Sequence, residues 1–185
     1  MKRKNLISTL VLTLSLTIIS PFITKAHAVE KLQAPSIKGT SAISIDYETG
    51  EIIYAKDIDA KAYPASTTKL MTALLFAENK SKNDDIKYTE EAKAQPAYSL
   101  NTNFQPIPIG GTMTAEDVMN ALLLYSANDS AYMIADAVGG TSDNFIKMMN
   151  DKAKELNLKN TNFVTPNGVD DGPNGDSHYT TAFDL

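Results

Sequence analysis

Alternating apolar and polar positions predict a β-hairpin over residues 41–54. Ile43 and Ile45 alternate with small or polar neighbours, and a second β-branched and aromatic run follows the turn sequence Thr49-Gly50. Glycine accepts the positive φ that tight turns require, so its place between the two runs is typical of a hairpin. We therefore expect two antiparallel strands here.

A helical period replaces this alternation after Pro64. Proline is favoured in the first turn of a helix, because the backbone N–H groups there have no partner. Residues 70–77 are apolar on nearly every side, which is typical of a helix at the centre of a fold. Further helices are predicted from apolar positions at helical spacing over residues 114–123, 130–138 and 142–156.

Two stretches lack such periodicity. Residues 86–111 contain three prolines and a double glycine, so they predict a long irregular connection. Residues 170–178 are polar and predict a loop, after which Thr181 and Asp184 have the spacing of a helix N-cap. No repeat or low-complexity segment is present, and the pattern as a whole indicates one domain.

The first 28 residues have the pattern of a secretory signal peptide. Basic residues occupy positions 2–4, an apolar run covers residues 6–19, and Ala-His-Ala at 26–28 is a cleavage signal with small residues at its outer positions. The predicted mature chain is therefore 29–185. A transmembrane helix is the alternative, but the apolar run is short for one and Pro21 follows it closely.

The charge balance is acidic. The chain has 17 basic and 22 acidic residues; four of the basic residues and none of the acidic ones fall within positions 1–28, so the predicted mature chain carries −9. No basic patch is visible, and nucleic-acid binding is not expected. An acidic surface suits an exported protein.

Cysteine and histidine usage restricts the possible chemistry. The chain has no cysteine, which excludes disulfides, thiolate nucleophiles and zinc–thiolate sites. Of its two histidines, only His178 lies outside the predicted signal peptide. A site with two histidine ligands is therefore excluded, and we expect no metal or cofactor. A serine nucleophile would more readily use lysine than His178 as its base, and His178 is expected to make a structural hydrogen bond.

The segment Ser66-Thr67-Thr68-Lys69 is the main candidate for catalytic chemistry. Residues three apart share one face of a helix, so Lys69 can reach the Ser66 hydroxyl. Lysine is normally protonated, with a pKa near ~10.4, but burial among apolar side chains lowers that pKa and allows it to accept a proton. The spacing alone is weak evidence, because a Ser-x-x-Lys match is expected about once by chance in a chain of this length. The apolar helix and the scarcity of histidine strengthen it.

A Ser-x-Asn element would complete such a site, with a hydroxyl to relay protons and an amide to hold substrate. Four copies are present, and they begin at Ser81, Ser99, Ser126 and Ser142. The first lies in a charged, solvated stretch, the second in the irregular connection, and the last is most simply a helix cap. Only Ser126-Ala127-Asn128 lies in a break between two apolar helices, where polar groups can point into a cleft. Ser126 and Asn128 are therefore the preferred candidates.

These segments resemble a known family. Residues 63–72, which read Tyr-Pro-Ala-Ser-Thr-Thr-Lys-Leu-Met-Thr, are similar to the nucleophile segment of low-molecular-mass penicillin-binding proteins, the serine-type D-alanyl-D-alanine carboxypeptidases of the peptidase S11 family. The other similar segments follow in the same order as in the family: the hairpin ending at Tyr54, then residues 124–129, 162–168 and 178–182. The resemblance implies an α+β fold of the β-lactamase/transpeptidase type, with an antiparallel sheet packed on a helical subdomain.

The resemblance also implies roles for the candidate residues. Ser66 would attack the penultimate D-Ala carbonyl of a peptidoglycan stem peptide ending in D-Ala-D-Ala, and Lys69 would accept its proton. Ser126 would relay a proton to the leaving amine, Asn128 would bind the acyl substrate, and β-lactam antibiotics would acylate Ser66. The site would lie on the extracellular or periplasmic side of the cytoplasmic membrane, at the cell wall. The resemblance implies membrane association only through a C-terminal anchor, which we do not expect in this chain.

One family element is missing. Members carry Lys-Thr-Gly on a later strand, where it binds the substrate carboxylate and supplies an oxyanion-hole N–H, and the tripeptide does not occur in this chain. Loss of a single oxyanion donor costs on the order of 10²–10³ in rate. We therefore predict the N-terminal part of a catalytic domain, incomplete because its C-terminal strands are absent, and weak or inactive by itself.

Two alternatives remain open. One is a non-catalytic penicillin-binding fragment or sensor, which would acylate without turnover. The other, less favoured, is a class A β-lactamase. That enzyme would need a glutamate after Ser-x-Asn to activate water, and the single candidate, Glu155, lies in a predicted amphipathic helix. Tyr98, Asn101 and residues 170–176 are further candidates for the walls of a substrate cleft.

Overall fold

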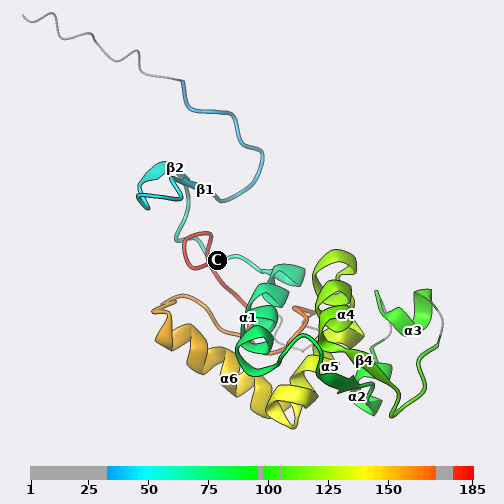
Figure 1. Ribbon diagram of the computed structural model, residues 1–185. Coiled ribbons are helices and arrows are strands. Elements are labelled where there is room, and N and C mark those ends of the chain that lie inside the picture. The colour runs from blue at the N-terminus through cyan, green and yellow to red at the C-terminus, as the bar shows by residue number, and fades with distance from the viewer. Residues whose placement is uncertain (1–32, 96–97, 105, 170–176) are drawn as a thin grey trace, which may run out of the picture. The chain divides into compact units, whose positions relative to one another are not determined.

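The computed structural model describes residues 33–95, 98–104, 106–169 and 177–185. The chain divides into two compact units, residues 1–35 and 36–185. Every helix and strand below belongs to the second unit (Figure 1). The predicted signal peptide and the proposed cleft residues 170–176 lie outside the described residues.

The predicted hairpin is present. Strands β1 (Ala42–Ile45) and β2 (Ile52–Lys56) pair in antiparallel fashion, with one irregularity in the register near the turn. The Asp46 carboxylate accepts hydrogen bonds from the Thr49 amide and hydroxyl, both at 2.8 Å, and so closes the turn. Gly50 has φ +73°, as a tight turn requires. The isoleucines near the turn remain largely exposed, so this two-stranded sheet buries little of its apolar surface.

The rest of the described chain is mainly helical. The helical elements are η1 (Ala65–Thr68), α1 (Lys69–Asn79), α2 (Glu90–Lys93), α3 (Leu100–Asn103), α4 (Ala115–Asn120), the π-helical turn η2 (Ala121–Tyr125), α5 (Asn128–Gly139) and α6 (Ser142–Glu155). A second antiparallel sheet consists of β3 (Asp85–Lys87) and β4 (Thr112–Thr114). Helix α5 contacts α1, α2, α4 and α6, and its apolar face supplies much of the buried core.

The prediction of an irregular connection over residues 86–111 is wrong. Its first residues complete β3, which pairs with β4, and two one-turn helices follow. Ile86 and Tyr88 are both buried. A strand of three residues and helices of four are too short to show a period, so tertiary packing determines this structure and local pattern does not.

The prediction that α1 is buried on every side is only partly correct. Met71, Leu75 and Phe76 pack into the core, but Leu70 is 56% exposed and Leu74 is 38% exposed. The two exposed leucines are four residues apart and therefore share one face of the helix. Within the described residues, α1 has one apolar face that is open to solvent.

The C-terminal residues return to the start of α1. Isolated antiparallel bridges join Ala62 to Thr180 and Asn162 to Tyr179. The expected N-cap at Thr181 is present, because its hydroxyl accepts a hydrogen bond from the backbone N–H three residues later, at 3.1 Å. The helix predicted to begin there is only a single turn in this structure.

We predict that Ser130→Ala is neutral or stabilises the fold by up to about 1 kcal/mol. Ser130 is fully buried in α5, and among the described residues its hydroxyl is the one buried side-chain polar atom without a hydrogen-bond partner. Thr72→Val is the matched comparison, because the buried Thr72 hydroxyl donates to the Pro166 carbonyl at 2.6 Å. That variant should lose about 1–2 kcal/mol in urea denaturation. Equal losses in both variants would contradict the assignment.

Candidate active site

Ser66 lies in a strained turn at the start of α1. Ala65, immediately before it, has φ +47°, which is costly for any residue other than glycine. Residues 65–68 form a 3-10 turn, and the regular helix begins only at Lys69. Ser66 itself is exposed. The turn therefore presents a serine hydroxyl to solvent on a backbone that the surrounding structure holds in place.

Lys69 is buried next to that hydroxyl. Its side chain is 2% exposed, and Nζ donates to Ser66 Oγ at 3.1 Å, Asn128 Oδ1 at 2.9 Å and the Asn167 carbonyl at 3.0 Å. An ammonium has three protons, and these three neutral acceptors use all of them. Burial lowers the pKa of Lys69 to about 8. The neutral amine is therefore a minor form near physiological pH but far more abundant than in an ordinary lysine, and it can accept the serine proton.

The break between η2 and α5 brings Asn128 to this lysine. Ser126 ends η2 in a left-handed conformation, with φ +63°, and α5 begins two residues later. Non-glycine residues in this conformation and π-helical turns are both frequent at functional sites. The structure thus joins Ser66, Lys69 and Asn128 by hydrogen bonds. Ser126 lies two residues before Asn128 and is partly buried. Within the described residues, no hydrogen bond links its hydroxyl to Ser66 or Lys69.

The other Ser-x-Asn copies lie elsewhere. Ser81 is exposed in the loop after α1, and Ser99 is buried. Ser142 is the first residue of α6, and the cap expected there is supplied by Thr141, whose hydroxyl accepts from the Asn144 amide at 3.2 Å. None of the three has a hydrogen bond to Lys69 among those that the described residues show.

Sequence reasoning missed the contribution of the turn at residues 166–168. The Asn167 carbonyl accepts from Lys69, and its side chain is held by hydrogen bonds to Gln95 (3.2 Å) and to the Val169 amide (2.9 Å). Asn167 is buried, so these bonds fix the position of its carbonyl. The sequence Pro-Asn-Gly indicated a turn, but nothing in it indicated that the turn lies against the nucleophile.

Gly168 makes the closest approach to the nucleophile turn. Its φ is +86°, and a Cβ built on it would lie 1.8 Å from the Ala65 carbonyl oxygen and 2.7 Å from Thr68 Oγ1. No side chain fits in that space. A glycine is therefore required here both for its backbone conformation and for contact with the residues on either side of Ser66.

His178 makes structural contacts next to the nucleophile turn, and these contacts give it no catalytic role. It is buried; its Nδ1 accepts from the Val164 amide at 3.0 Å, and its Nε2 lies 2.7 Å from Thr68 Oγ1. Because Nδ1 is an acceptor, a neutral ring has its proton on Nε2 and donates to Thr68. These are the structural hydrogen bonds expected from the sequence.

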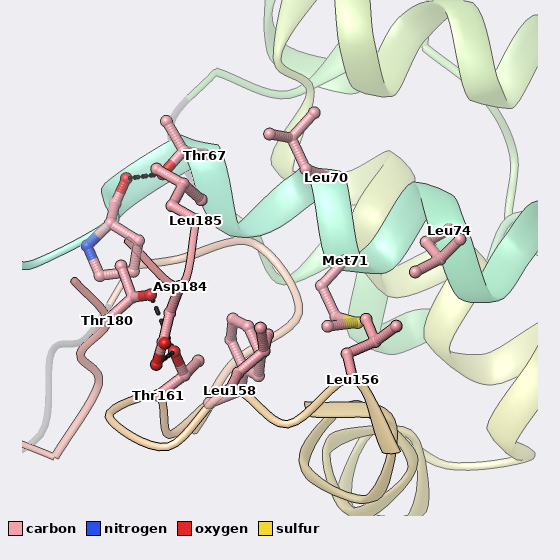
Figure 2. A pocket seen from close by; sticks show the side chains of 12 residues that line it. Thr67, Leu70, Met71, Leu74, Leu156, Leu158, Thr161, Thr180, Asp184 and Leu185 are labelled. Carbon is pink, nitrogen blue, oxygen red and sulfur yellow. Dashed lines mark hydrogen bonds between the residues drawn. The ribbon is translucent and has the colours of Figure 1, made fainter. Parts of the chain in front are cut away.

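An apolar pocket occupies the opposite side of α1 (Figure 2). Leu70, Met71 and Leu74 of α1 line it together with Leu156 and Leu158, and Met71 points toward Leu156. Neither Ser66 nor Lys69 lines this pocket, so the candidate active site is identified by its polar contacts. Among the described residues, no group of three or more acidic or histidine side chains is placed to hold a metal ion.

Comparison with known proteins places this geometry in a family. The peptidase S11 family, described as D-alanyl-D-alanine carboxypeptidase, matches residues 28–185. The chain belongs to the peptidase S11 family. The S11 assignment covers the hairpin, the nucleophile turn and the segment that carries Asn128, as the sequence resemblance predicted.

Among curated S11 relatives, D-alanyl-D-alanine carboxypeptidase DacF of Bacillus subtilis is 31% identical over 183 residues, covering 98% of this chain and 46% of DacF. DacC of Escherichia coli is 31% identical over 173 residues, covering 89% of this chain and 42% of DacC. The chain thus spans less than half the length of these relatives.

Solved structures of a carboxypeptidase and a penicillin-binding protein agree with the fold. D-alanyl-D-alanine carboxypeptidase DacD from Francisella tularensis matches with a TM-score of 0.72 and 28% identity, over 81% of this chain and 35% of DacD. Penicillin-Binding Protein D2 from Listeria monocytogenes, in its cefotaxime-bound form, matches with a TM-score of 0.69 and 30% identity, over 82% of this chain and 61% of that protein. The predicted α+β, transpeptidase-like fold is confirmed, and the two small antiparallel sheets are consistent with an incomplete domain of that type.

Proposed function

We propose that this chain provides the nucleophile part of a serine-type D-alanyl-D-alanine carboxypeptidase that acts on peptidoglycan stem peptides. The observation that supports this most strongly is the contact between Lys69 Nζ and Ser66 Oγ, 3.1 Å apart, with the lysine buried and its pKa lowered to about 8. A neutral amine next to a serine hydroxyl is a recognised way to activate that hydroxyl.

The proposed reaction has two steps. Ser66 Oγ attacks the penultimate D-Ala carbonyl while Lys69 takes the hydroxyl proton, and the peptide C–N bond then breaks. Ser126 relays a proton to the departing D-Ala amine, and Asn128 binds the acyl part of the substrate. Water then attacks the ester, loses a proton to the same base and releases the shortened peptide with Ser66 restored. The same Ser66 chemistry opens a β-lactam ring and leaves a covalent adduct.

The 185 residues of this chain contain no Lys-Thr-Gly tripeptide, so the activity expected here is that of this chain by itself. With fewer oxyanion donors, the tetrahedral intermediate is less stabilised, at a cost on the order of 10²–10³ for each donor lost. We therefore expect this chain alone to acylate slowly and to turn over weakly. A penicillin-binding fragment or sensor that acylates without turnover is the second candidate, and the missing tripeptide is the observation that favours it.

A class A β-lactamase is disfavoured. Glu155, the glutamate that would have to activate water, is exposed at the end of α6 and pairs with Lys152 at 3.0 Å. No hydrogen bond joins it to Ser66, Lys69 or Asn128 within the described residues.

Location and partners follow from the same proposal. The substrate is a wall component, so we place the working site at the periplasmic or outer face of the cytoplasmic membrane, after cleavage of a signal peptide at residues 1–28. The supporting pattern is the basic, apolar and small-residue sequence of that segment. No helix in the described part of the chain has the length and apolar character needed to cross a membrane. The partners are stem peptides ending in D-Ala-D-Ala and β-lactams; no nucleic acid, cofactor or metal is proposed.

The first test uses fluorescent penicillin on the purified chain and on Ser66→Ala. We expect slow covalent labelling of the wild type, located at Ser66 by peptide mass spectrometry, and none of the variant. Ser142→Ala, which changes the serine of an unrelated Ser-x-Asn copy, serves as the control and should label normally. Equal labelling of Ser66→Ala would refute the assignment of the nucleophile. Release of D-Ala from a D-Ala-D-Ala peptide would separate a weak enzyme from a binder.

A further inference from the structure

A fully buried carboxylate lies one residue beyond Asn128. Asp129, the second residue of α5, is 0% exposed. Its hydrogen-bond donors are the Leu100 amide (2.8 Å to Oδ2 and 3.0 Å to Oδ1), the Asn101 amide (3.2 Å), the Tyr88 hydroxyl (3.2 Å) and the Ser130 amide (3.0 Å). Three segments distant in sequence therefore meet at one side chain.

Among the described residues, this carboxylate is held by hydrogen bonds. None of the ion pairs among the described residues includes Asp129. A buried ionised carboxylate is costly unless donors surround it, so the amides of the 98–101 turn cannot leave without a large penalty. Burial raises the pKa of the Tyr88 phenol, and the nearby Asp129 charge raises it further, as expected of a hydroxyl that stays protonated and donates.

Asn128, which precedes Asp129 and contacts Lys69, also binds the 98–101 turn. The Asn128 amide donates to the Tyr98 carbonyl at 2.8 Å, while the Asn128 side chain accepts from Lys69 at 2.9 Å. Tyr98 has φ +48°, so the turn adopts a strained conformation that its contacts must maintain. Asn128 and Asp129 thus attach one turn to the start of α5 through adjacent residues.

We propose that Asp129 is a positioning residue for the nucleophile site. By holding the 98–101 turn against the start of α5, it keeps Asn128 Oδ1 at hydrogen-bond distance from Lys69 Nζ. It touches neither Ser66 nor Lys69 itself, and it acts through Asn128. This inference rests on the proposed function only for its kinetic consequence, because the lysine environment can be measured without any substrate.

The test compares Asp129→Asn with Asp143→Asn. Asp143 is the second residue of α6, as Asp129 is of α5, but it is exposed; the control therefore removes the same charge from the same helical position. The primary readout is the titration midpoint of Lys69, which is measured from the ¹⁵Nζ chemical shift in protein labelled with ¹⁵N-lysine. Hydrogen exchange at the Leu100 and Asn101 amides reports whether the turn is released.

For Asp129→Asn, we expect exchange at those amides to rise at least about tenfold, because an NH₂ that cannot accept replaces one of the two accepting oxygens and the remaining hydrogen bonds lose the charge that strengthens them. The Lys69 midpoint should fall below that of the wild type, since its ammonium loses the Asn128 acceptor. Penicillin acylation should slow on the order of tenfold to a hundredfold, in keeping with a small misplacement of the base. Asp143→Asn should change none of these.

The outcomes separate this inference from the proposed function. A folded Asp129→Asn protein with released amides but an unchanged Lys69 midpoint would overturn the positioning role and leave a purely structural one. A shifted midpoint in a chain that never acylates would support positioning while refuting the function. If Asp129→Asn does not fold, Tyr88→Phe removes a single donor and should move the midpoint in the same direction by less; no movement there would overturn the inference.

Discussion

Gly168→Ala is expected to unfold or severely destabilise the chain, by at least about 3 kcal/mol, and to abolish labelling of Ser66. The new methyl group would lie 1.8 Å from the Ala65 carbonyl oxygen and 2.5 Å from its carbon. Both are backbone atoms, so relief requires the nucleophile turn itself to move. That turn is already strained, because Ala65 has φ +47°. Urea denaturation followed by circular dichroism measures the loss.

Gly140→Ala is the matched control for this prediction. Gly140 also has a left-handed backbone, with φ +78°, but a Cβ there would meet nothing within 4 Å. That variant should lose about 1–2 kcal/mol, the cost of the conformation alone. The difference between the two variants isolates the contact with the nucleophile turn. Similar losses in both would show that Gly168 is needed only for its φ.

Lys69→Met is expected to lower the rate of β-lactam acylation by about 10²–10⁴, the usual contribution of a general base. Methionine fills a similar volume but cannot accept the Ser66 proton. Time courses of the benzylpenicillin adduct, measured by intact-protein mass spectrometry, provide the rates. Lys147→Met is the control, since that lysine is exposed on α6 and pairs with Asp151 at 2.6 Å. Unchanged acylation in Lys69→Met would refute its role as the base.

The wild-type pH profile gives an independent check. The neutral form of Lys69 increases as pH rises through its pKa of about 8, so acylation should increase with pH and level off above it. A profile that is flat between pH 6 and pH 9 would contradict lysine as the base.

Lys69 should also make stability depend on pH. Its pKa falls from 10.5 to about 8 on folding, so between these values the unfolded chain binds more protons than the folded chain. Stability should therefore rise with pH across this window, by roughly 3 kcal/mol in total, and the penalty is fully present below pH 8. The rise should be absent in Lys69→Met. A parallel pH dependence in both proteins would show that other groups cause it.

Local sequence signals were sufficient wherever the structure depends on nearby residues. The hairpin at residues 41–54 followed from alternation and a glycine turn, and the break at Ser126 followed from polar residues between two apolar helices. The choice of Asn128 among four Ser-x-Asn copies rested on that break, and the structure brings this one to Lys69. Short elements between residues 86 and 111 escaped notice because they are shorter than any readable period.

The spacing of Ser66 and Lys69 and the identity of the family were determined by the sequence, because the first depends on neighbours along one helix and the second on an ordered set of motifs. The apolar helix indicated a lowered lysine pKa, but the burial itself comes from segments distant in sequence that pack against Lys69. Only the tertiary structure decided what surrounds them. The Asn167 carbonyl reaches Lys69 across 98 residues, Gly168 fits against Ala65, and the Asp129 carboxylate binds amides 28 and 29 residues away. Contacts at such separations leave no period in a single sequence, since they arise when distant segments pack against one another.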